Sequence, residues 1–140
     1  MIQMLGGIDS TASALAAERT RLEVITQNIT NANTVHGLGG KPYQRQHVIF
    51  EAALNQAQAG GVEPHAVTVA RIENDSRPPR LVYNPGHPDA NGDGMVAMPD
   101  INIHEEMADM IAASRAFEAN LAVVKNARAM AMQTLSIGKH

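Results

Sequence analysis

Apolar residues at both ends of this 140-residue chain recur at a spacing of about 3.5, which keeps one side of a helix against a partner helix. Near the N-terminus an apolar residue returns at every seventh position. These positions are Met1, Ile8, Leu15, Leu22 and Ile29, with Met4, Leu5, Ala12 and Ile25 beside them. Such a stripe requires a neighbour along its whole length, and that neighbour is the other end of the chain, another subunit or both.

A second stripe near the C-terminus follows alternating steps of four and three residues. Its members are Ile103, Met107, Met110, Phe117, Leu121, Val124, Ala131 and Leu135. Ser114 and Arg128 interrupt it with polar side chains. Either the stripe is imperfect at these two positions, or the polar groups set the register between neighbouring helices, as buried polar residues do in coiled coils.

The two stripes predict two long helices. The first begins near Ile8 or a few residues earlier and continues to about Ile29, with an alanine-rich first half that favours helix. The last runs from about Ile103 to Ser136 and would be about 50 Å long at a rise of ~1.5 Å per residue. The roughly 60 residues between the helices are too few to cover it. We therefore expect its stripe to be buried in an assembly.

The middle of the chain lacks the aromatic residues that supply the largest burials in a core. The whole sequence has only two Phe, two Tyr and no Trp. Alternating residues predict strands over 43–50, within 62–74 and over 81–83. The segment 51–59 is either a short helix or a disordered insert, and the Gly- and Pro-rich segment 84–100 is predicted to be a long turn-rich loop.

Together these elements predict an α+β fold. Long N- and C-terminal helices pack as a coiled-coil-like pair or bundle, with a small β-rich middle domain. The expected organisation is an N-terminal helix with an Asn-rich motif over 1–35, a β-rich middle with long loops over 36–100, and a C-terminal helix over 101–140.

Charge and composition exclude several function classes. The formal net charge is −3, which gives no electrostatic reason to expect nucleic acid or an anionic membrane as partner. The chain has no Cys, which excludes disulfides and thiol chemistry. No apolar run approaches the roughly 18 residues of a membrane span. Residues 12–14 resemble a signal-peptidase site, but no Lys or Arg precedes Arg19, so no cleaved signal is expected.

The strongest chemical motif is a calcium-loop pattern near residue 90. Asp89, Asn91 and Asp93 occupy its first, third and fifth positions, and Asp100 occupies the twelfth. Against it, Asp stands where a bidentate Glu normally completes the coordination, and the Pro-rich residues 84–88 cannot form the entering helix. A soluble calcium-responsive binding module that uses these four residues is the alternative hypothesis for function.

No enzymatic motif is recognisable. None of the six His residues forms a His-x-x-x-His pair, and position 108, where a zinc protease would place its second His after His104, is Ala. A nucleophile elbow and a phosphate-binding loop are also missing from the sequence. We expect no catalysis, no metal, no cofactor and no small-molecule substrate.

The first helix ends in a segment with three Asn residues within six positions: Asn28, Asn31 and Asn33. Asn side chains bond to the backbone and tolerate the left-handed conformation that closes a helix. A helix stop is the simpler interpretation, and a motif for contacts between chains is the more specific one.

The same Asn-rich segment resembles the motif after the first helix in axial proteins of the bacterial flagellum. Further segments match the proximal-rod members of that family in order and spacing. They are 41–45 (KPYQR), 87–90 (HPDA) through 94–96 (GMV), 99–102 (PDIN), 106–107 (EM), 114–120 (SRAFEAN) and 137–138 (IG). The resemblance covers nearly the whole chain. It departs from the family pattern at Met4-Leu5, where an aromatic is usual, at Met95 and Phe117, where Tyr is usual, and in the loop 37–40.

The resemblance implies a structural subunit of the rod, the drive shaft that crosses the periplasm. The resemblance also implies that members of the family are exported unfolded by the flagellar type III apparatus without signal cleavage. Their terminal helices form the inner tube, the β-rich middle lies outside, and the loop from Asp89 to Asp100 is a family feature. The implied partners are copies of the chain, other rod proteins and the adaptor at the rod base. The expected assembly interface comprises Ile8, Leu15, Leu22, Ile25, Asn28, Ile29, Asn31, Asn33, Met107, Met110, Ser114, Arg115, Phe117, Asn120, Leu121, Val124, Arg128 and Leu135.

Overall fold

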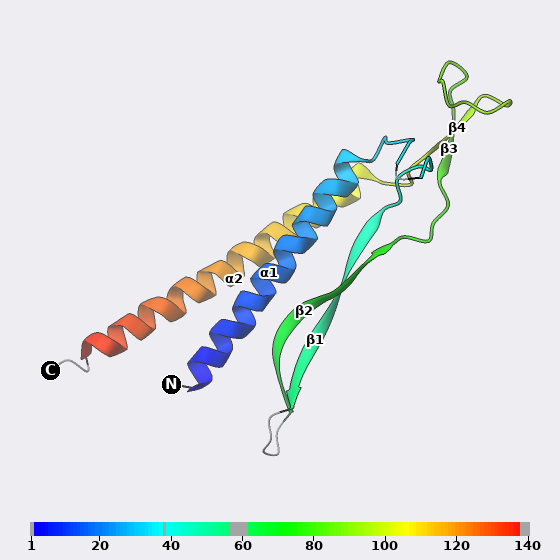
Figure 1. Cartoon of the computed structure of the whole chain (residues 1–140). Coiled ribbons are helices and arrows are strands. Elements are labelled where there is room, and N and C mark those ends of the chain that lie inside the picture. The colour runs from blue at the N-terminus through cyan, green and yellow to red at the C-terminus, as the bar shows by residue number, and fades with distance from the viewer. Residues whose placement is uncertain (1, 38, 57–61, 138–140) are drawn as a thin grey trace.

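The computed structural model of the chain describes residues 2–37, 39–56 and 62–137, and it confirms the α+β class (Figure 1). Two long helices enclose four strands in the sequence. The elements are α1 (Ile2–Thr30), β1 (Gln46–Gln56), β2 (Val62–Asn74), β3 (Arg80–Tyr83), β4 (Met95–Met98) and α2 (Ile103–Ile137). None of the helices in the described residues is long and apolar enough to cross a membrane.

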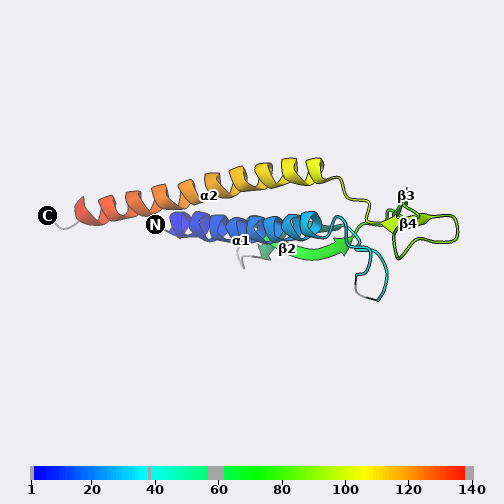
Figure 2. The ribbon, with the colours of Figure 1, turned by 90° about the horizontal axis from the view of Figure 1, so that it is seen from above.

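The helices run antiparallel, and α1 lies in the middle of the molecule. Figures 1 and 2 show α2 along one side of α1 and the β1–β2 ribbon along the other. Within the described residues α2 packs on no strand. The fully buried apolar side chains of α1 therefore lie between its two neighbours, α2 and the β1–β2 ribbon. They are Ala17, Val24 and Ile25. The expected heptad positions Ile8, Leu15, Leu22 and Ile29 are only half-buried.

The helix ends follow from local hydrogen bonds. The Asn102 side-chain oxygen accepts from the backbone N–H of His104 at 3.1 Å and caps α2, whose first turn carries two Glu residues that suit a helix N-terminus. After α1, the backbone N–H of Thr34 donates to the carbonyl of Asn31 at 3.0 Å. We expected an Asn in the left-handed conformation at the end of this helix. The structure shows none, since only Gly residues have a positive φ among the described residues.

The segment after Glu51 forms strand, which corrects the expectation of a short helix or insert. Strand β1 continues to Gln56 because β2 pairs with it antiparallel along its whole length, from Gln46 opposite Asn74 to Gln56 opposite Val62. Residues 57–59 of that expected insert lie outside the described residues. Strand β1 starts at Gln46 rather than at the expected Tyr43. Register irregularities after Ile49 and after Ala53 accompany the bend of the ribbon in Figure 1.

The predicted loop over 84–100 contains a fourth strand, β4, which is a second correction. Its residues pair antiparallel with β3, with Val82 opposite Val96. The hairpin closes because the backbone N–H of Asn84 donates to the carbonyl of Gly94 at 2.9 Å. Gly94 has φ +73, and a Cβ there would lie 3.0 Å from the Tyr83 ring. Glycine therefore fits this position, because it adopts a positive φ without strain and has no Cβ to contact the Tyr83 ring.

Close approach of the two helices depends on small side chains, which gives a first prediction. Ala113 of α2 is 0% exposed on the side that packs against α1. Ala113→Leu should separate the helices and lower the free energy of unfolding by about 1–3 kcal/mol, as overpacking does in cores. The measurement is urea unfolding of the purified chain followed by circular dichroism.

Ala122→Leu is the matched control for this variant. Ala122 is exposed and lies nine positions further on, half a turn around the helix at about 100° per residue. Ala122→Leu should leave the free energy of unfolding unchanged. Equal destabilisation by both substitutions would contradict the packing of α2 against α1.

Candidate functional site

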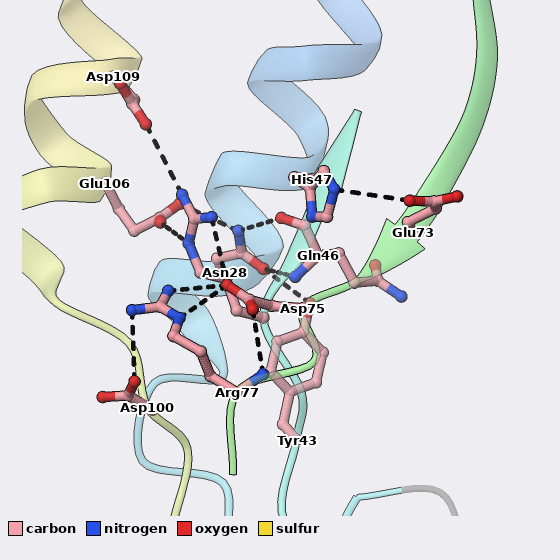
Figure 3. Close-up of polar contacts among 11 residues, drawn as sticks. Asn28, Tyr43, Gln46, His47, Glu73, Asp75, Arg77, Asp100, Glu106 and Asp109 are labelled. Carbon is pink, nitrogen blue, oxygen red and sulfur yellow. Dashed lines mark hydrogen bonds and ion pairs between the residues drawn. The ribbon is translucent and has the colours of Figure 1, made fainter. Parts of the chain in front are cut away.

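Polar side chains gather where α1 ends, β1 begins and α2 begins, and we call this cluster the polar joint (Figure 3). Its members come from segments far apart in the sequence. They are Asn28, Tyr43, Arg45, Gln46, Asp75, Arg77, Asp100, Glu106 and Asp109. The joint therefore connects both terminal helices to the middle of the chain.

Asn28 is 1% exposed and uses its whole hydrogen-bonding capacity inside the chain. Its Nδ2 donates to the carbonyl of Gln46 at 2.8 Å and to Oε2 of Glu106 at 3.0 Å. Its Oδ1 accepts from the backbone N–H of Gln46 at 2.9 Å and from the Tyr43 hydroxyl at 3.1 Å. Two donors and two acceptors are all that an Asn amide offers. Aspartate could not make the two donated bonds.

Glu106 places a carboxylate in the centre of the joint with only 1% of its surface exposed. Its Oε1 accepts from Nε of Arg45 at 2.6 Å. Arg45 also lies 3.7 Å from Asp109 and 3.9 Å from Asp75. A buried charge is tolerated only when it is paired and hydrogen-bonded, and Arg45 and Asn28 supply the ion pair and the hydrogen bond for Glu106.

A second ion pair ties the segment after β2 to the segment before α2. Asp75 accepts from the backbone N–H of Arg77 at 3.1 Å and from its Nε at 2.9 Å, and Arg77 lies 3.3 Å from Asp100. The hydrogen bonds from Arg77 lower the pKa of Asp75 below its ordinary value and raise that of Arg77. Half of the Arg77 side chain is exposed, so this pair contributes less than the buried one.

The predicted interface residues fall into two groups in the structure. Asn28 is inside the polar joint, Asn31 donates to the carbonyl of Gln27 at 2.9 Å within the helix end, and Asn33 is exposed. Most of the remaining predicted residues are buried or half-buried. They are Ile8, Leu15, Leu22, Ile25, Ile29, Met110, Ser114, Phe117, Asn120, Leu121 and Val124. Met107, Arg115, Arg128 and Leu135 are exposed.

The stripe predicted for α2 contains residues on two sides of the helix. Met110, Phe117, Val124 and Ala131, each seven residues after the last, are half-buried on the side of α1. A second series lies one residue earlier in each repeat; it is half-buried at Asp109 and Ala116 and exposed in the C-terminal half of α2. Its large members are Val123, Met130 and Ile137. This second series was not predicted from the sequence, although its seven-residue spacing was a visible signal.

The joint itself was also missed, apart from Asn28. Arg45 and Glu106 are 61 residues apart, and no local pattern marks them as partners. The one available signal for a buried charge was Glu106, which lies next to the apolar stripe, one residue before its member Met107. The prediction placed Met107, and not Glu106, on the buried side of the helix, whereas in the structure Glu106 is buried and Met107 is exposed.

The calcium hypothesis gains no support from the loop that suggested it. Asp89 binds His36, with 2.7 Å between Oδ1 and Nε2, and Asp100 pairs with Arg77. The Asn91 oxygen accepts from the backbone N–H groups of Asp93 and Met95 at 3.0 and 2.9 Å, which orders the turn. Across the described ranges, no three His, Asp or Glu side chains are arranged to hold a metal ion.

Removal of Arg45 tests the joint. Arg45→Met keeps much of the side-chain volume but leaves Glu106 buried with only Asn28 as partner. The free energy of unfolding should fall by about 3–5 kcal/mol, the cost of an uncompensated buried charge. Urea unfolding at neutral pH measures it. Arg80→Met is the control, because Arg80 is exposed and makes no ion pair within the described chain. A loss below ~1 kcal/mol for Arg45→Met would contradict the buried pair.

The environment of Tyr43 gives a pH prediction. Burial, and secondly the negative charge of Glu106, raise the pKa of Tyr43 above 10.0. The chain has two Tyr, so Tyr83→Phe leaves Tyr43 as the single phenol. Its absorbance titration should have a midpoint above 10 in the folded chain and near 10 in urea. Because the raised pKa favours the neutral phenol, this contribution to stability is present below pH 10 and is lost as pH rises through the folded pKa. Identical titration midpoints in the folded chain and in urea would refute the raised pKa of Tyr43.

Both ends of the chain match families of known proteins. Residues 8–36 match the family described as "Flagella basal body rod protein", and residues 93–137 match "Flagellar basal body rod FlgEFG protein C-terminal". The first match contains most of α1 and its Asn-rich end, and the second contains β4 and α2.

Whole-chain comparisons identify relatives of nearly the same length. The chain is 37% identical over 138 residues to the flagellar basal-body rod protein FlgC of Yersinia enterocolitica, which covers 99% of this chain and 100% of that protein. Identity to the FlgC protein of Borreliella burgdorferi is 39% over 147 residues, with 96% and 97% covered. For FlgC of Bacillus subtilis it is 34% over 144 residues, with 94% and 96% covered. The chain belongs to the FlgC family of flagellar basal-body rod proteins.

Proposed function

We propose that this chain is a structural subunit of the proximal rod of the flagellar basal body. It polymerises through its terminal helices with copies of itself and with other rod proteins, and it has no catalytic role. One observation carries the proposal, namely that α2 leaves large apolar side chains uncovered over 103–111 and again over 123–137. They are Ile103, Met107, Ile111, Val123, Met130, Met132, Leu135 and Ile137.

An exposed series of this length requires neighbours. Single apolar residues on a surface are ordinary, but a continuous apolar surface on a helix marks an interface. The one intramolecular neighbour, α1, covers one side of α2. The C-terminal end of α2 extends beyond α1 in both views (Figures 1 and 2). Adjacent subunits would cover what α1 leaves open, and packing of helices against one another would form the inner tube.

The polar joint supports a mechanical role. A subunit that transmits torque must resist bending between its helices and its outer part. Asn28 and Glu106 link α1, α2 and the start of β1 by hydrogen bonds of 2.8–3.0 Å in a buried site. Fully satisfied buried polar networks rigidify the groups that they connect. Each subunit would therefore rotate with the rod as one body, with the β1–β2 ribbon on the outside.

The small core suits export before assembly. Six apolar residues are fully covered within the described part, and three of them are Ala. A core of this size stabilises a chain only marginally. Such a chain would pass unfolded through the flagellar type III apparatus without cleavage of a signal. It would reach the periplasm, bind the adaptor at the rod base, and gain most of its stability there from its neighbours.

Substitution of an exposed apolar residue separates assembly from folding. Ile111 is 55% exposed, so Ile111→Asp should leave the unfolding midpoint of the purified chain nearly unchanged. In the rod it would bury an unpaired charge, and we expect loss of motility in soft agar and loss of rods from isolated basal bodies.

Ile111→Val is the matched control, because it changes the same exposed position but keeps an apolar side chain and adds no charge. It should retain more motility. A strain without the gene should build no rod. Intact rods in that strain would contradict the proposed function itself.

A further inference from the structure

The β3–β4 hairpin carries an apolar face on which two large side chains, Leu81 and Tyr83, are mostly exposed. Leu81 pairs with Ala97 and Tyr83 pairs with Met95, so these four side chains share one face. Leu81 is 60% exposed and Tyr83 is 70% exposed. We call this face the hairpin patch. Among the described elements, β3 and β4 pack only on each other.

The opposite face of the same hairpin is covered, so the exposure is specific to one side. Val96 is 1% exposed and lies opposite the half-buried Val82. The Tyr83 ring lies close to Gly94, since a Cβ there would be 3.0 Å from its Cε2. An aromatic ring on an exposed apolar face is a frequent anchor of an interface.

The hairpin patch and the free end of α2 are at opposite ends of the molecule (Figures 1 and 2). From the contact between Asn28 and Glu106, equal rise along both helices places the start of α1 opposite roughly residue 132. Beyond that point α2 has no helix beside it, and Ile137 is 75% exposed. One uncovered apolar surface at each end permits a heterologous, head-to-tail contact, which continues from subunit to subunit.

The charges of the two ends are complementary. The loop that joins β3 and β4 carries Asp89 and Asp93 and no Lys or Arg, and Asp93 is exposed without an ion pair in the described chain. Residues 119–137 of α2 carry Lys125 and Arg128 and no acidic residue. Both cations are exposed and unpaired within the described residues. Complementary charge favours this pairing and steers it.

From these observations we propose that the hairpin patch binds the C-terminal end of the helix equivalent to α2 in the adjacent axial subunit. The family that matches residues 93–137 has FlgE, FlgF and FlgG in its description, and the matched segment of this chain contains β4 and α2. The apolar series of that helix packs on Leu81 and Tyr83, and its basic residues face Asp93. The inference rests on the proposed function and adds the direction of assembly to it.

The size of the contact determines where it must be tested. Four side chains of a short hairpin offer less than the roughly 1,200 Å² that a stable independent interface buries. The pair should therefore form only in the assembled rod, where lateral contacts hold both partners in place. Binding between purified chains is not a suitable readout.

Site-specific photo-cross-linking in assembled rods tests the proposal. Benzoyl-phenylalanine replaces Tyr83, or Leu81, in cells that depend on this chain for motility, and mass spectrometry locates the cross-linked peptide. Both positions should cross-link to the last twenty or so residues of an axial subunit. Arg80 is the matched control, because it is exposed on the same strand and faces the other side. Its yield into that peptide should be at least several-fold lower.

Two other outcomes would overturn the inference. Cross-links from Tyr83 into a different element, or into a protein outside the axial family, would show that another partner covers the hairpin patch. Equal yields from Arg80 and Tyr83 would show that the face has no specificity. Motile cells with either result would leave the proposed rod function standing, whereas rods that assemble without the gene would remove that function.

A charge exchange gives a readout that does not depend on the probe. Asp93→Lys should reduce the rate of swarming in soft agar, since it places a cation against basic residues of the neighbour. Asp93→Asn should reduce it less. Neither variant should alter the unfolding midpoint of the purified chain, because Asp93 has no ion pair to lose in the described chain. Unchanged swarming with Asp93→Lys would contradict the proposed orientation.

Discussion

The buried carboxylate of Glu106 determines how the two ends of the chain meet. A charge removed from water must be compensated nearby, and the compensation here comes from two other segments. Arg45 supplies the cation at 2.6 Å, and Asn28 supplies a hydrogen bond at 3.0 Å. A shift of α1 along α2 by one turn would move Asn28 by about 5.4 Å and break its contact. Glu106 thus fixes both the register of the helices and the position at which the β1–β2 ribbon starts.

Apolar packing alone would not fix this register. The stripes consist of Ala, Leu, Ile, Val and Met with one Phe at a seven-residue repeat, and such a repeat accepts a shift of one heptad with similar burial. A buried polar group accepts only one partner arrangement. Buried ion pairs often add little net stability compared with apolar replacements. We infer that the polar joint selects one arrangement of the helices more than it stabilises the chain, which is what a repeating assembly needs from each subunit.

The sequence predicted the elements whose causes are local and missed those whose causes are distant. The helices were predicted because their periodicity lies within each segment, and their ends differ from expectation by only a few residues, except that α1 begins already at Ile2. The segment 51–56 became strand because β2 lies opposite it, and Met95–Met98 became strand because β3 does. Neither segment has a strong preference of its own. The pairing that decides their conformation cannot be read from local composition.

The candidate site shows the same division. Asn28 was recognisable within an Asn-rich motif, but the motif offered helix termination and contacts between chains as its explanations. Its four hydrogen bonds inside the chain depend on partners 15 to 78 residues away. Nothing in the local sequence marks Arg45 and Glu106 as partners, because a charged residue beside an apolar stripe is ordinarily solvated. Only the fold brings their charges together.

The two series on α2 explain why the chain is incomplete by itself. Val123 and Val124 are neighbours in sequence, yet about 100° of rotation separates them, so only one can face α1. The same holds for Met130 and Ala131, seven residues later. A helix with one apolar series needs one partner helix, and a helix with two series needs two. Since α1 provides the first and the described chain provides no second, the sequence of α2 supports the proposal that a neighbouring subunit covers the second series.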